Sequence, residues 1–408
     1  MIDLTWDQSI RPVLLRRYGK LTEEQLREAH AYAYGGCVIQ DLGYYPFGNV
    51  FFSDLTHYVR AGDFVSSLLR NAHSANELAF AIGALSHYVG DAIGHADATN
   101  QSVAIEFPKL AQKYGPSVNY AEGKDQHVRT EFAFDINQLS KRNHAPAAYL
   151  DHVGIKVPAI LVQKAVFETY GLDAHKMIGD KKVVVRGYRK SVRNYIPEVA
   201  RAEAILHKER FPDDPPSDPS NQLQKDISLA SSINGWEPYR KSPGFRTHVL
   251  AGVIFILPKV GSLSMLSIRG PNPQTEALYI DSVNRSVSQL RELLAGYRTI
   301  PTHVPNRDLD TGDAVKPGGY PLTDETYAQL LETLTRTPTR PIPFSLKRDI
   351  LAYYSDPDAP ITTKKNQKKW AAVQSQLKVL ATMPTSEDPS QVLEDMEQPA
   401  NHDDPGNL

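Results

Sequence analysis

The sequence predicts an all-α protein. Apolar residues recur at helical spacing along most of its 408 residues, whereas the alternating runs typical of strands are scarce. The nearest strand candidate, at residues 182–185, is too short to form a sheet. Hydrophobic residues make up 41% of the chain, which is enough for a substantial core. We therefore expect a multi-helix bundle, with additional helices towards the C-terminus.

Helices are predicted where this spacing runs between capping residues, glycines and prolines. In the N-terminal half they cover residues 3–17, 22–37, 53–71, 75–98, 122–141, 157–169 and 181–204. In the C-terminal half they cover residues 223–235, 244–257, 273–297, 323–334, 344–354 and 365–382. Thr22, Ser53 and Thr323 each precede acidic residues, so they are the predicted N-caps.

Pro-rich stretches at residues 211–219 and 299–321 are predicted loops, because proline lacks a backbone donor and interrupts helices. The last stretch has seven acidic residues and no Lys or Arg, a composition typical of disorder. The predicted organisation is a helical domain (1–205), a Pro-rich loop (206–222), a C-terminal helical extension packed on the first domain (223–383) and a disordered acidic tail (384–408).

Composition and charge bear on several function classes. A formal charge of -2 gives no electrostatic reason to expect a stable nucleic-acid partner. The longest apolar stretch, residues 249–268, is split by Pro258, Lys259 and Gly261, and the unbroken run that remains is too short to span a bilayer, although it could touch a membrane surface. Cys37 is the only cysteine, which excludes an intrachain disulfide and a cysteine-based zinc site. The first residues do not have the pattern of a signal peptide.

The most informative motif is the spacing of His87, Asp91 and His95, four residues apart on one predicted helix. Each step of four residues turns a helix by about 400°, so the three side chains form one stripe that points into a cleft. A lone histidine on such a helix is more often a hydrogen-bonded core residue. If three such groups were buried without a metal, each would need a hydrogen-bond partner of its own. A divalent ion satisfies all three together.

Other ligand-type residues lie nearby in the sequence. His127 and Glu131 form a second pair four residues apart, Asp41 lies in a glycine-rich aromatic turn, and His57 follows in the next predicted helix. Imidazole and carboxylate ligands suit zinc, with manganese or iron as poorer alternatives. The HExxH motif of zinc proteases is absent, and the spacing also differs from that of di-iron bundles. These residues suffice for at least two metal ions.

The order and type of these residues resemble the zinc-dependent phospholipase C family, whose wider fold includes the single-strand-specific zinc nucleases. The resemblance covers roughly residues 25 to 140. It implies an all-helical enzyme that cleaves phosphodiesters, with Asp41 as a candidate general base. It further implies one zinc surrounded by Asp41, His57, His87 and Asp91, and another surrounded by His95, His127 and Glu131.

Members of this family usually carry a third zinc, held by an N-terminal Trp and a His on the first helix. Here the first Trp is Trp6 and the first His is His30, so these ligands are missing and we expect two zinc ions. His30 is an alternative ligand, or an ordinary hydrogen-bonded residue. His73 has no partner at ligand spacing and is expected on the surface. The resemblance implies an exported protein, while the chain itself shows no export signal.

The predicted substrate is a phospholipid headgroup ester, because the near-neutral charge disfavours a nuclease, which would benefit from a basic groove. Tyr44, Tyr45 and Phe47 lie beside Asp41 and could form an aromatic cage for a quaternary ammonium group, or could instead pack in the core. Two alternatives stay open. One is a non-catalytic family member that binds zinc, and the other is a nuclease for single-stranded nucleic acid.

Overall fold

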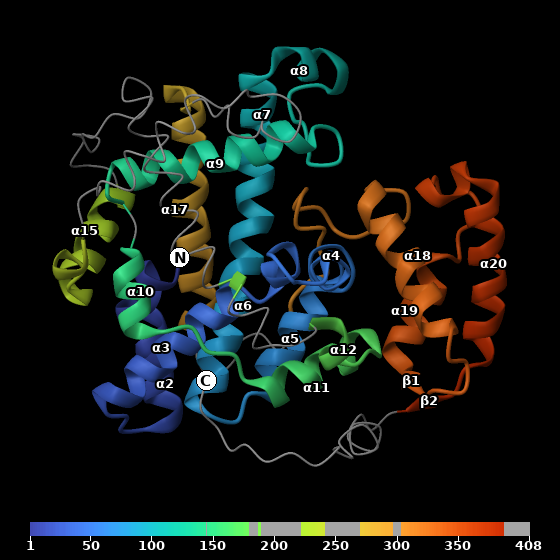
Figure 1. Ribbon diagram of the computed structural model, residues 1–408, viewed down its shortest axis with the longest axis horizontal. Coiled ribbons are helices and arrows are strands. Elements are labelled where there is room, and N and C mark those ends of the chain that lie inside the picture. The colour runs from blue at the N-terminus through green and yellow to red at the C-terminus, as the bar shows by residue number, and fades with distance from the viewer. Residues whose placement is uncertain (144, 179–186, 189–221, 241–269, 297–302, 387–408) are drawn as a thin grey trace.

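The computed structural model describes residues 1–143, 145–178, 187–188, 222–240, 270–296 and 303–386. In these residues the regular structure is almost entirely helical, so the all-α prediction is confirmed (Figure 1). The two strands there are β1 (Ile342–Pro343) and β2 (Thr385–Ser386), which form a short parallel pair. No helix in the described part of the chain has the length and apolar character to cross a membrane.

The N-terminal elements follow one another closely. They are α1 (Ile2–Thr5), η1 (Trp6–Ile10), α2 (Arg11–Tyr18), α3 (Glu23–Cys37), η2 (Gln40–Tyr44), α4 (Val50–Tyr58), α5 (Ala61–Asn71), α6 (Ala75–Gly94), η3 (His95–Thr99), α7 (Asn100–Glu106), α8 (Pro108–Tyr114), α9 (Lys124–Ser140), α10 (Ala147–Val153), α11 (Ala159–Tyr170) and α12 (Ala174–Ile178).

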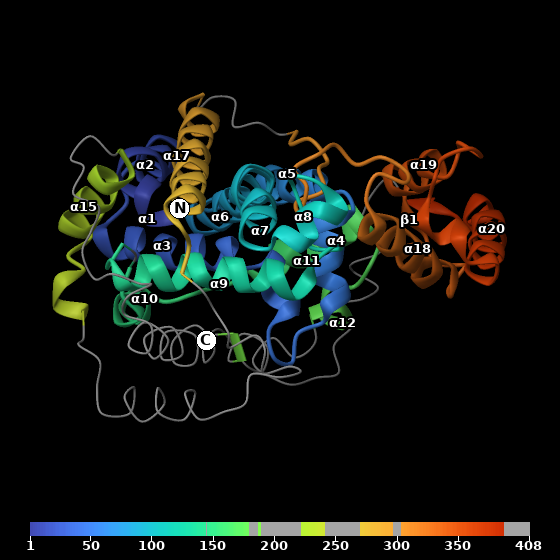
Figure 2. The ribbon, with the colours of Figure 1, turned by 90° about the horizontal axis from the view of Figure 1, so that it is seen from above.

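The C-terminal elements are α15 (Gln222–Asn234), η5 (Glu237–Tyr239), α17 (Pro273–Ala295), α18 (Pro321–Thr335), α19 (Phe344–Tyr353), η8 (Thr362–Lys365) and α20 (Gln367–Thr382). Helices α18, α19 and α20 gather at one end of the molecule, while α17 lies against α6 (Figures 1 and 2). The C-terminal half therefore contacts the core of the N-terminal half through α17.

The central packing is between α3 and α6, whose backbones approach closely at two glycines. A Cβ atom at Gly36 would lie 1.8 Å from the carbonyl oxygen of Phe80. One at Gly83 would lie 2.1 Å from the carbonyl oxygen of Ala33. Only glycine fits such an approach, which explains why the helix-disfavouring Gly83 stands inside α6.

Several predicted boundaries are wrong in detail. The predicted helix over residues 53–71 is two helices, because Arg60 takes a left-handed backbone conformation (φ 51°) between α4 and α5. Thr22 does cap α3, in a reciprocal hydrogen-bonded arrangement with Gln25. Ser53 lies inside α4 and accepts a hydrogen bond from the Gly43 N–H instead. Thr323 lies inside α18, where its hydroxyl donates to the side chain of Asp308.

Some expectations fall on residues that are not described. The predicted helix over 244–257 and nearly all of that over 181–204 lie outside the described residues, as do most of the predicted loop 206–222 and of the tail 384–408. Conversely, α7, α8 and α10 are helices that the sequence patterns did not indicate. The proposed division of the chain into domains stays a prediction.

Candidate metal centre

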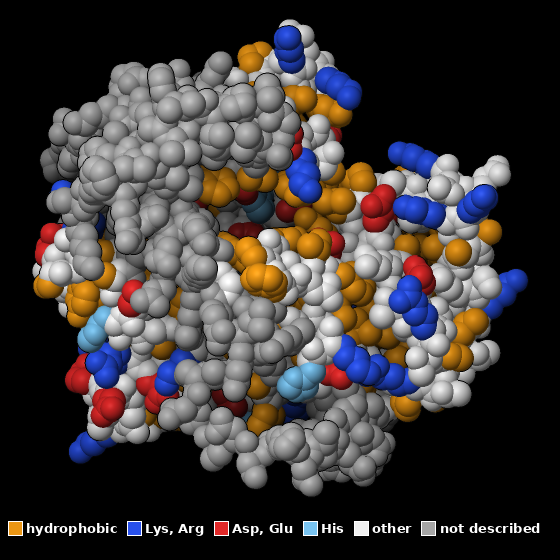
Figure 3. Space-filling view, viewed as in Figure 1, with side chains coloured by type: hydrophobic (Ala, Val, Ile, Leu, Met, Phe, Trp, Pro, Cys, Tyr) orange, Lys and Arg blue, Asp and Glu red, His pale blue; other side chains and the backbone are white. Residues whose placement is uncertain are grey.

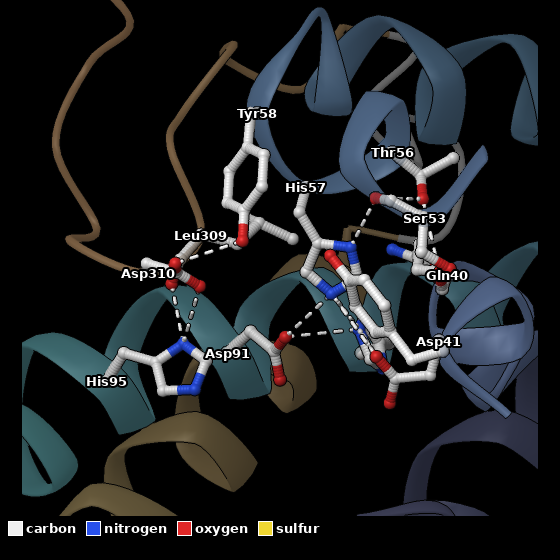
Figure 4. Close-up of polar contacts among 12 residues, drawn as sticks. Gln40, Asp41, Ser53, Thr56, His57, Tyr58, Asp91, His95, Leu309 and Asp310 are labelled. Carbon is white, nitrogen blue, oxygen red and sulfur yellow. Dashed lines mark hydrogen bonds and ion pairs between the residues drawn. The ribbon is translucent and has the colours of Figure 1, made fainter. Parts of the chain in front are cut away.

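Two groups of ligand-type side chains lie along α6, and both consist of residues predicted from the sequence. In the first group, the ligand atoms of Asp41, His57 and His87 all lie within 4.8 Å of one another. In the second, the same holds for His95, His127 and Glu131. Helix α6 and the π-helical turn η3 that continues it supply a histidine to each group (Figure 4).

The first group joins three elements: the short helix η2, the last turns of α4 and the middle of α6. The Nε2 atom of His57 lies 3.3 Å from Oδ1 of Asp41 and 3.3 Å from Nε2 of His87. Asp91 lies beside them, with Oδ2 at 3.4 Å from His57 Nε2 and 3.1 Å from His87 Nε2. Its role as a fourth ligand stays a prediction.

Each histidine of this group uses Nδ1 for a main-chain carbonyl. His57 Nδ1 lies 2.7 Å from the carbonyl oxygen of Ser53, and His87 Nδ1 lies 3.0 Å from that of Cys37. A carbonyl oxygen can only accept, so Nδ1 carries the proton and donates it. The remaining nitrogen, Nε2, then faces the carboxylates, which is the arrangement found for histidine ligands of metals.

The second group joins η3, which continues α6, to α9. Oε1 of Glu131 lies 2.9 Å from Nε2 of His95 and 3.2 Å from Nε2 of His127. His95 Nδ1 lies 2.8 Å from the carbonyl oxygen of Leu309. The stripe of three residues is thus divided as the family resemblance implies, with His87 in the first group, Asp91 beside it and His95 in the second group.

Electrostatics in the first group reflect strong mutual attraction. Burial lowers the pKa of His57, but hydrogen bonds to Asp41 and Asp91 outweigh it and raise that pKa well above its ordinary value. Burial also lowers the pKa of His87, and the nearby charges of Asp91 and Asp41 raise it on balance. Burial raises the pKa of Asp91, yet the two histidines bring it well below its usual range.

The second group behaves in the same way. Burial lowers the pKa of His95, but the hydrogen bond to Glu131 and neighbouring carboxylates raise it to about 10. Burial raises the pKa of Glu131, but His127 and His95 lower it to about 2. Imidazolium and carboxylate groups thus neutralise one another when no ion is bound.

The residues fit zinc on two grounds. Their donor atoms are imidazole nitrogens and carboxylate oxygens, the set that zinc takes in proteins without cysteine ligands. In addition, Nε2 of His57, His87 and His95 is directed at a carboxylate while Nδ1 is held by a carbonyl. A divalent ion would replace the protons that these groups otherwise share.

Comparison with known proteins bears on the N-terminal part of the chain. Residues 8–178 match the model of the family described as zinc-dependent phospholipase C. The match covers less than half of the 408 residues. No curated protein and no solved structure matches the chain. All seven predicted ligands lie within the matched segment: Asp41, His57, His87, Asp91, His95, His127 and Glu131.

A hollow leads to the candidate metal centre. Figure 3 shows histidine and acidic side chains at its bottom and hydrophobic side chains around its edge, where α4, α6 and α9 meet. The side chains of Asp41 and Glu131 are each 38% exposed, whereas those of His57 and His127 are buried. The two carboxylates are thus the more accessible members of their groups.

The three predicted substrate-binding residues lie near this hollow but differ in their surroundings. The Tyr44 ring lies 5.4 Å from that of His57, and its hydroxyl donates to Asp54. Tyr45 packs edge-on against Tyr188. Phe47 is 75% exposed. Tyr44 is the one in ring contact with a predicted metal ligand, and the aromatic cage stays a prediction.

The two other histidines considered as ligands lie outside both groups. His30 is buried, stacks on Trp6 with ring centroids 4.0 Å apart and places Nε2 3.0 Å from Oδ1 of Asp3. These contacts are those of a hydrogen-bonded core residue, and a role of His30 as an alternative ligand stays a prediction. His73 is exposed, as expected from its isolated position in the sequence.

The sequence patterns missed the contribution of the segment before α18. Leu309 contacts His95 as described above, and Asp310 and Asn100 are buried beside it. The one available signal was the acidic run at residues 308–313 inside a predicted Pro-rich loop. Nothing in that run indicates contact with residues more than two hundred positions earlier.

Proposed function

We propose that the protein is a zinc-dependent phosphodiester hydrolase that acts as a phospholipase C on the headgroup ester of a phospholipid. The observation that carries this proposal is the pair of adjacent His and carboxylate groups at the bottom of an accessible hollow. The match of residues 8–178 to the phospholipase C family supports the same chemistry. Both groups lie in that segment.

Zinc bound in the two groups would supply Lewis acidity for the phosphoryl oxygens and lower the pKa of water at the site. The residues of the chain then have separate tasks. The buried histidines hold the site rigidly, because each has a second partner in the protein or a carboxylate within reach. We assign Asp41 as the general base, since its carboxylate is both part of the first group and open to the hollow.

A lipid substrate is supported by the apolar surface next to Asp41. Phe47 and Val50 are 75% and 55% exposed, and Tyr44, whose ring contacts that of His57, is 45% exposed. Phe47 also has a left-handed backbone conformation (φ 71°), which a non-glycine residue rarely adopts. Exposed apolar groups at one turn are suited to transient contact with a membrane surface. Tyr44 could contact the headgroup at the same time.

The decisive experiment measures zinc content and hydrolysis together. Purified protein loaded with zinc is assayed on phosphatidylcholine vesicles for release of phosphocholine, and on single-stranded DNA. The wild type is compared with the Asp91→Asn, His127→Ala double variant, and the exposed His73→Ala variant is the matched histidine control. We expect phosphocholine release and two zinc ions per chain in the wild type and in His73→Ala, with both lost in the double variant.

Other outcomes would each overturn part of the proposal. Fewer than one zinc in the wild type would show that the metal centre is wrongly assigned. Two zinc ions without hydrolysis of any phosphodiester would indicate a non-catalytic family member. Cleavage of DNA that weakens as salt is added, with vesicles left intact, would indicate a nuclease.

A further inference from the structure

A segment from the C-terminal half of the chain reaches the metal centre. We call residues 304–315 the 304–315 loop. Leu309 in this loop donates its N–H to the carbonyl oxygen of His57 at 3.1 Å. Its own carbonyl accepts from Nδ1 of His95 at 2.8 Å. Because His57 and His95 belong to different metal groups, one residue of the loop contacts both (Figure 4).

The next residue, Asp310, is buried against the same histidine. Its Oδ1 lies 4.0 Å from Nδ1 of His95. Its Oδ2 accepts hydrogen bonds from the hydroxyls of Tyr58 at 3.0 Å and Tyr320 at 2.6 Å. Asn100 donates to its carbonyl oxygen at 2.7 Å. The carboxylate is therefore held in place from several sides, with one oxygen directed to the imidazole.

The loop is also pressed against α6 between two of its ligands. Gly312 has φ 73°, and a Cβ there would lie 2.4 Å from the carbonyl oxygen of Ala92, the residue after Asp91. Earlier in the loop, the carbonyl of Pro305 accepts from the Tyr88 hydroxyl at 2.6 Å. A close approach that admits only glycine fixes the position of the loop relative to His95.

We infer that Asp310 is a positioning residue of the second metal group, acting with the Leu309 carbonyl to orient the His95 imidazole towards the ion. An imidazole whose Nδ1–H is held by a carbonyl and faces a carboxylate presents Nε2 as a fixed and more basic donor. The 304–315 loop lies outside the segment that matches the family model. The metal centre of this protein thus depends on its C-terminal half. This inference rests on the proposed zinc centre.

The test compares zinc affinity at the two groups in the full chain. Asp310→Asn keeps the shape of the side chain and can still accept from Tyr58 and Tyr320, but removes the negative charge. Zinc dissociation constants are measured by competition with a chelator. We expect one of the two ions to bind about 10- to 100-fold more weakly, the usual effect of removing such a partner, and the other to be unchanged.

A second background assigns the affected group. His127→Ala removes a ligand of the second group only, so the ion that remains reports on the first. In that background Asp310→Asn should have no effect on zinc affinity. Replacing zinc by cobalt adds a spectroscopic readout, because Asp310→Asn should alter the visible absorption of the wild type but not that of the His127→Ala protein.

Asp308→Asn is the matched structural control. Asp308 is buried in the same loop and accepts hydrogen bonds from Thr311 and Thr323, but it contacts no predicted ligand in the described structure. This variant should lower the melting temperature without selective loss of one ion. If Asp310→Asn does not fold, Tyr320→Phe replaces it, with weaker zinc binding at the second group expected in the same direction.

The outcomes separate this inference from the proposed function. Equal weakening of both ions, or none, in the Asp310→Asn protein would overturn the positioning role while leaving the metal centre intact. If Asp308→Asn and Asp310→Asn weakened zinc binding equally, the 304–315 loop would have only a structural role, and the positioning role of Asp310 would also be overturned. A wild type that binds no zinc would remove the basis of both proposals.

Discussion

The histidines of the metal centre show how the folded chain assigns a task to each ring nitrogen. His57 and His87 donate from Nδ1 to main-chain carbonyls four and fifty residues away. That geometry leaves Nε2 free for an ion but, without one, within reach of Asp41 and Asp91. The same carboxylates that would bind zinc therefore stabilise protons on the imidazoles.

Zinc binding should consequently release protons. In the metal-free protein at pH 7, His95 is protonated, because its pKa is about 10, and the pKa values of His57 and His87 are raised as well. Zinc takes neutral imidazole, so each protonated ligand must give up a proton. Isothermal titration calorimetry in buffers of different ionisation enthalpy should show a binding heat that varies with the buffer. A heat that is independent of the buffer would contradict the prediction.

The stability of the metal-free protein should fall as the pH rises above neutrality. An unfolded histidine has a pKa of about 6.5, and that of folded His95 is about 10. Its contribution is fully present below about pH 6.5 and is lost as the pH rises through about 10. Thermal melts with a chelator should show a falling melting temperature over this range. The zinc-loaded protein should be much less affected, since its imidazoles are already neutral.

At the scale of the elements, the contact between α3 and α6 sets the position of the first metal group. The carbonyl of Cys37, at the end of α3, accepts from His87 on α6, so the two helices must approach closely for this bond to form. Gly36 and Gly83 make the approach possible. Gly90, also on α6, has no described atom within 4 Å of the position of a Cβ and needs another explanation.

Alanine substitutions at Gly36 and Gly90 should change the free energy of unfolding in opposite directions. Gly36→Ala places a methyl group 1.8 Å from a backbone oxygen and should cost at least about 2 kcal/mol of unfolding free energy. Gly90→Ala adds a better helix former in open space and should stabilise by up to about 1 kcal/mol. Chemical denaturation of both variants checks this. A neutral Gly36→Ala would mean that the helices are less tightly packed than described.

At the scale of the whole molecule, the C-terminal half supplies packing and hydrogen bonds to the N-terminal half. Val287, Leu290 and Leu294 of α17 are buried in the protein interior, and α17 packs on α6. The 304–315 loop supplies hydrogen bonds to His57 and His95. Both contacts cross from residues beyond 270 to the segment that matches the phospholipase C family.

A fragment of residues 1–205 should therefore be a poor substitute for the full chain. It would expose the face of α6 that α17 covers and would lack the partner of His95 Nδ1. We expect it to aggregate or to lose zinc at least about tenfold more readily than the full protein. Size-exclusion chromatography and chelator competition measure both effects. A monomeric fragment with two tightly bound zinc ions would show that the first half is self-sufficient.

Much of the fold and of the ligand set could be predicted because both depend on local periodicity. Helical spacing indicated an all-α protein, and the capping residue Thr22 was identified correctly. Predicted helix boundaries were wrong where a contact with a distant residue decides the local conformation. Arg60, where the predicted helix over 53–71 is broken, donates from its guanidinium to the Thr169 carbonyl. Thr323 failed as a cap for the same reason, since Asp308 takes its hydroxyl.

The sequence by itself determined which side chains can bind a metal, because spacings of four on a helix place His87 beside Asp91 and His127 beside Glu131 whatever surrounds them. Only the tertiary structure decided how these pairs meet. It set the distances within the two groups that the family resemblance implies, and it placed Leu309 and Asp310 behind His95. Such contacts join residues far apart in the chain, and no local pattern encodes them.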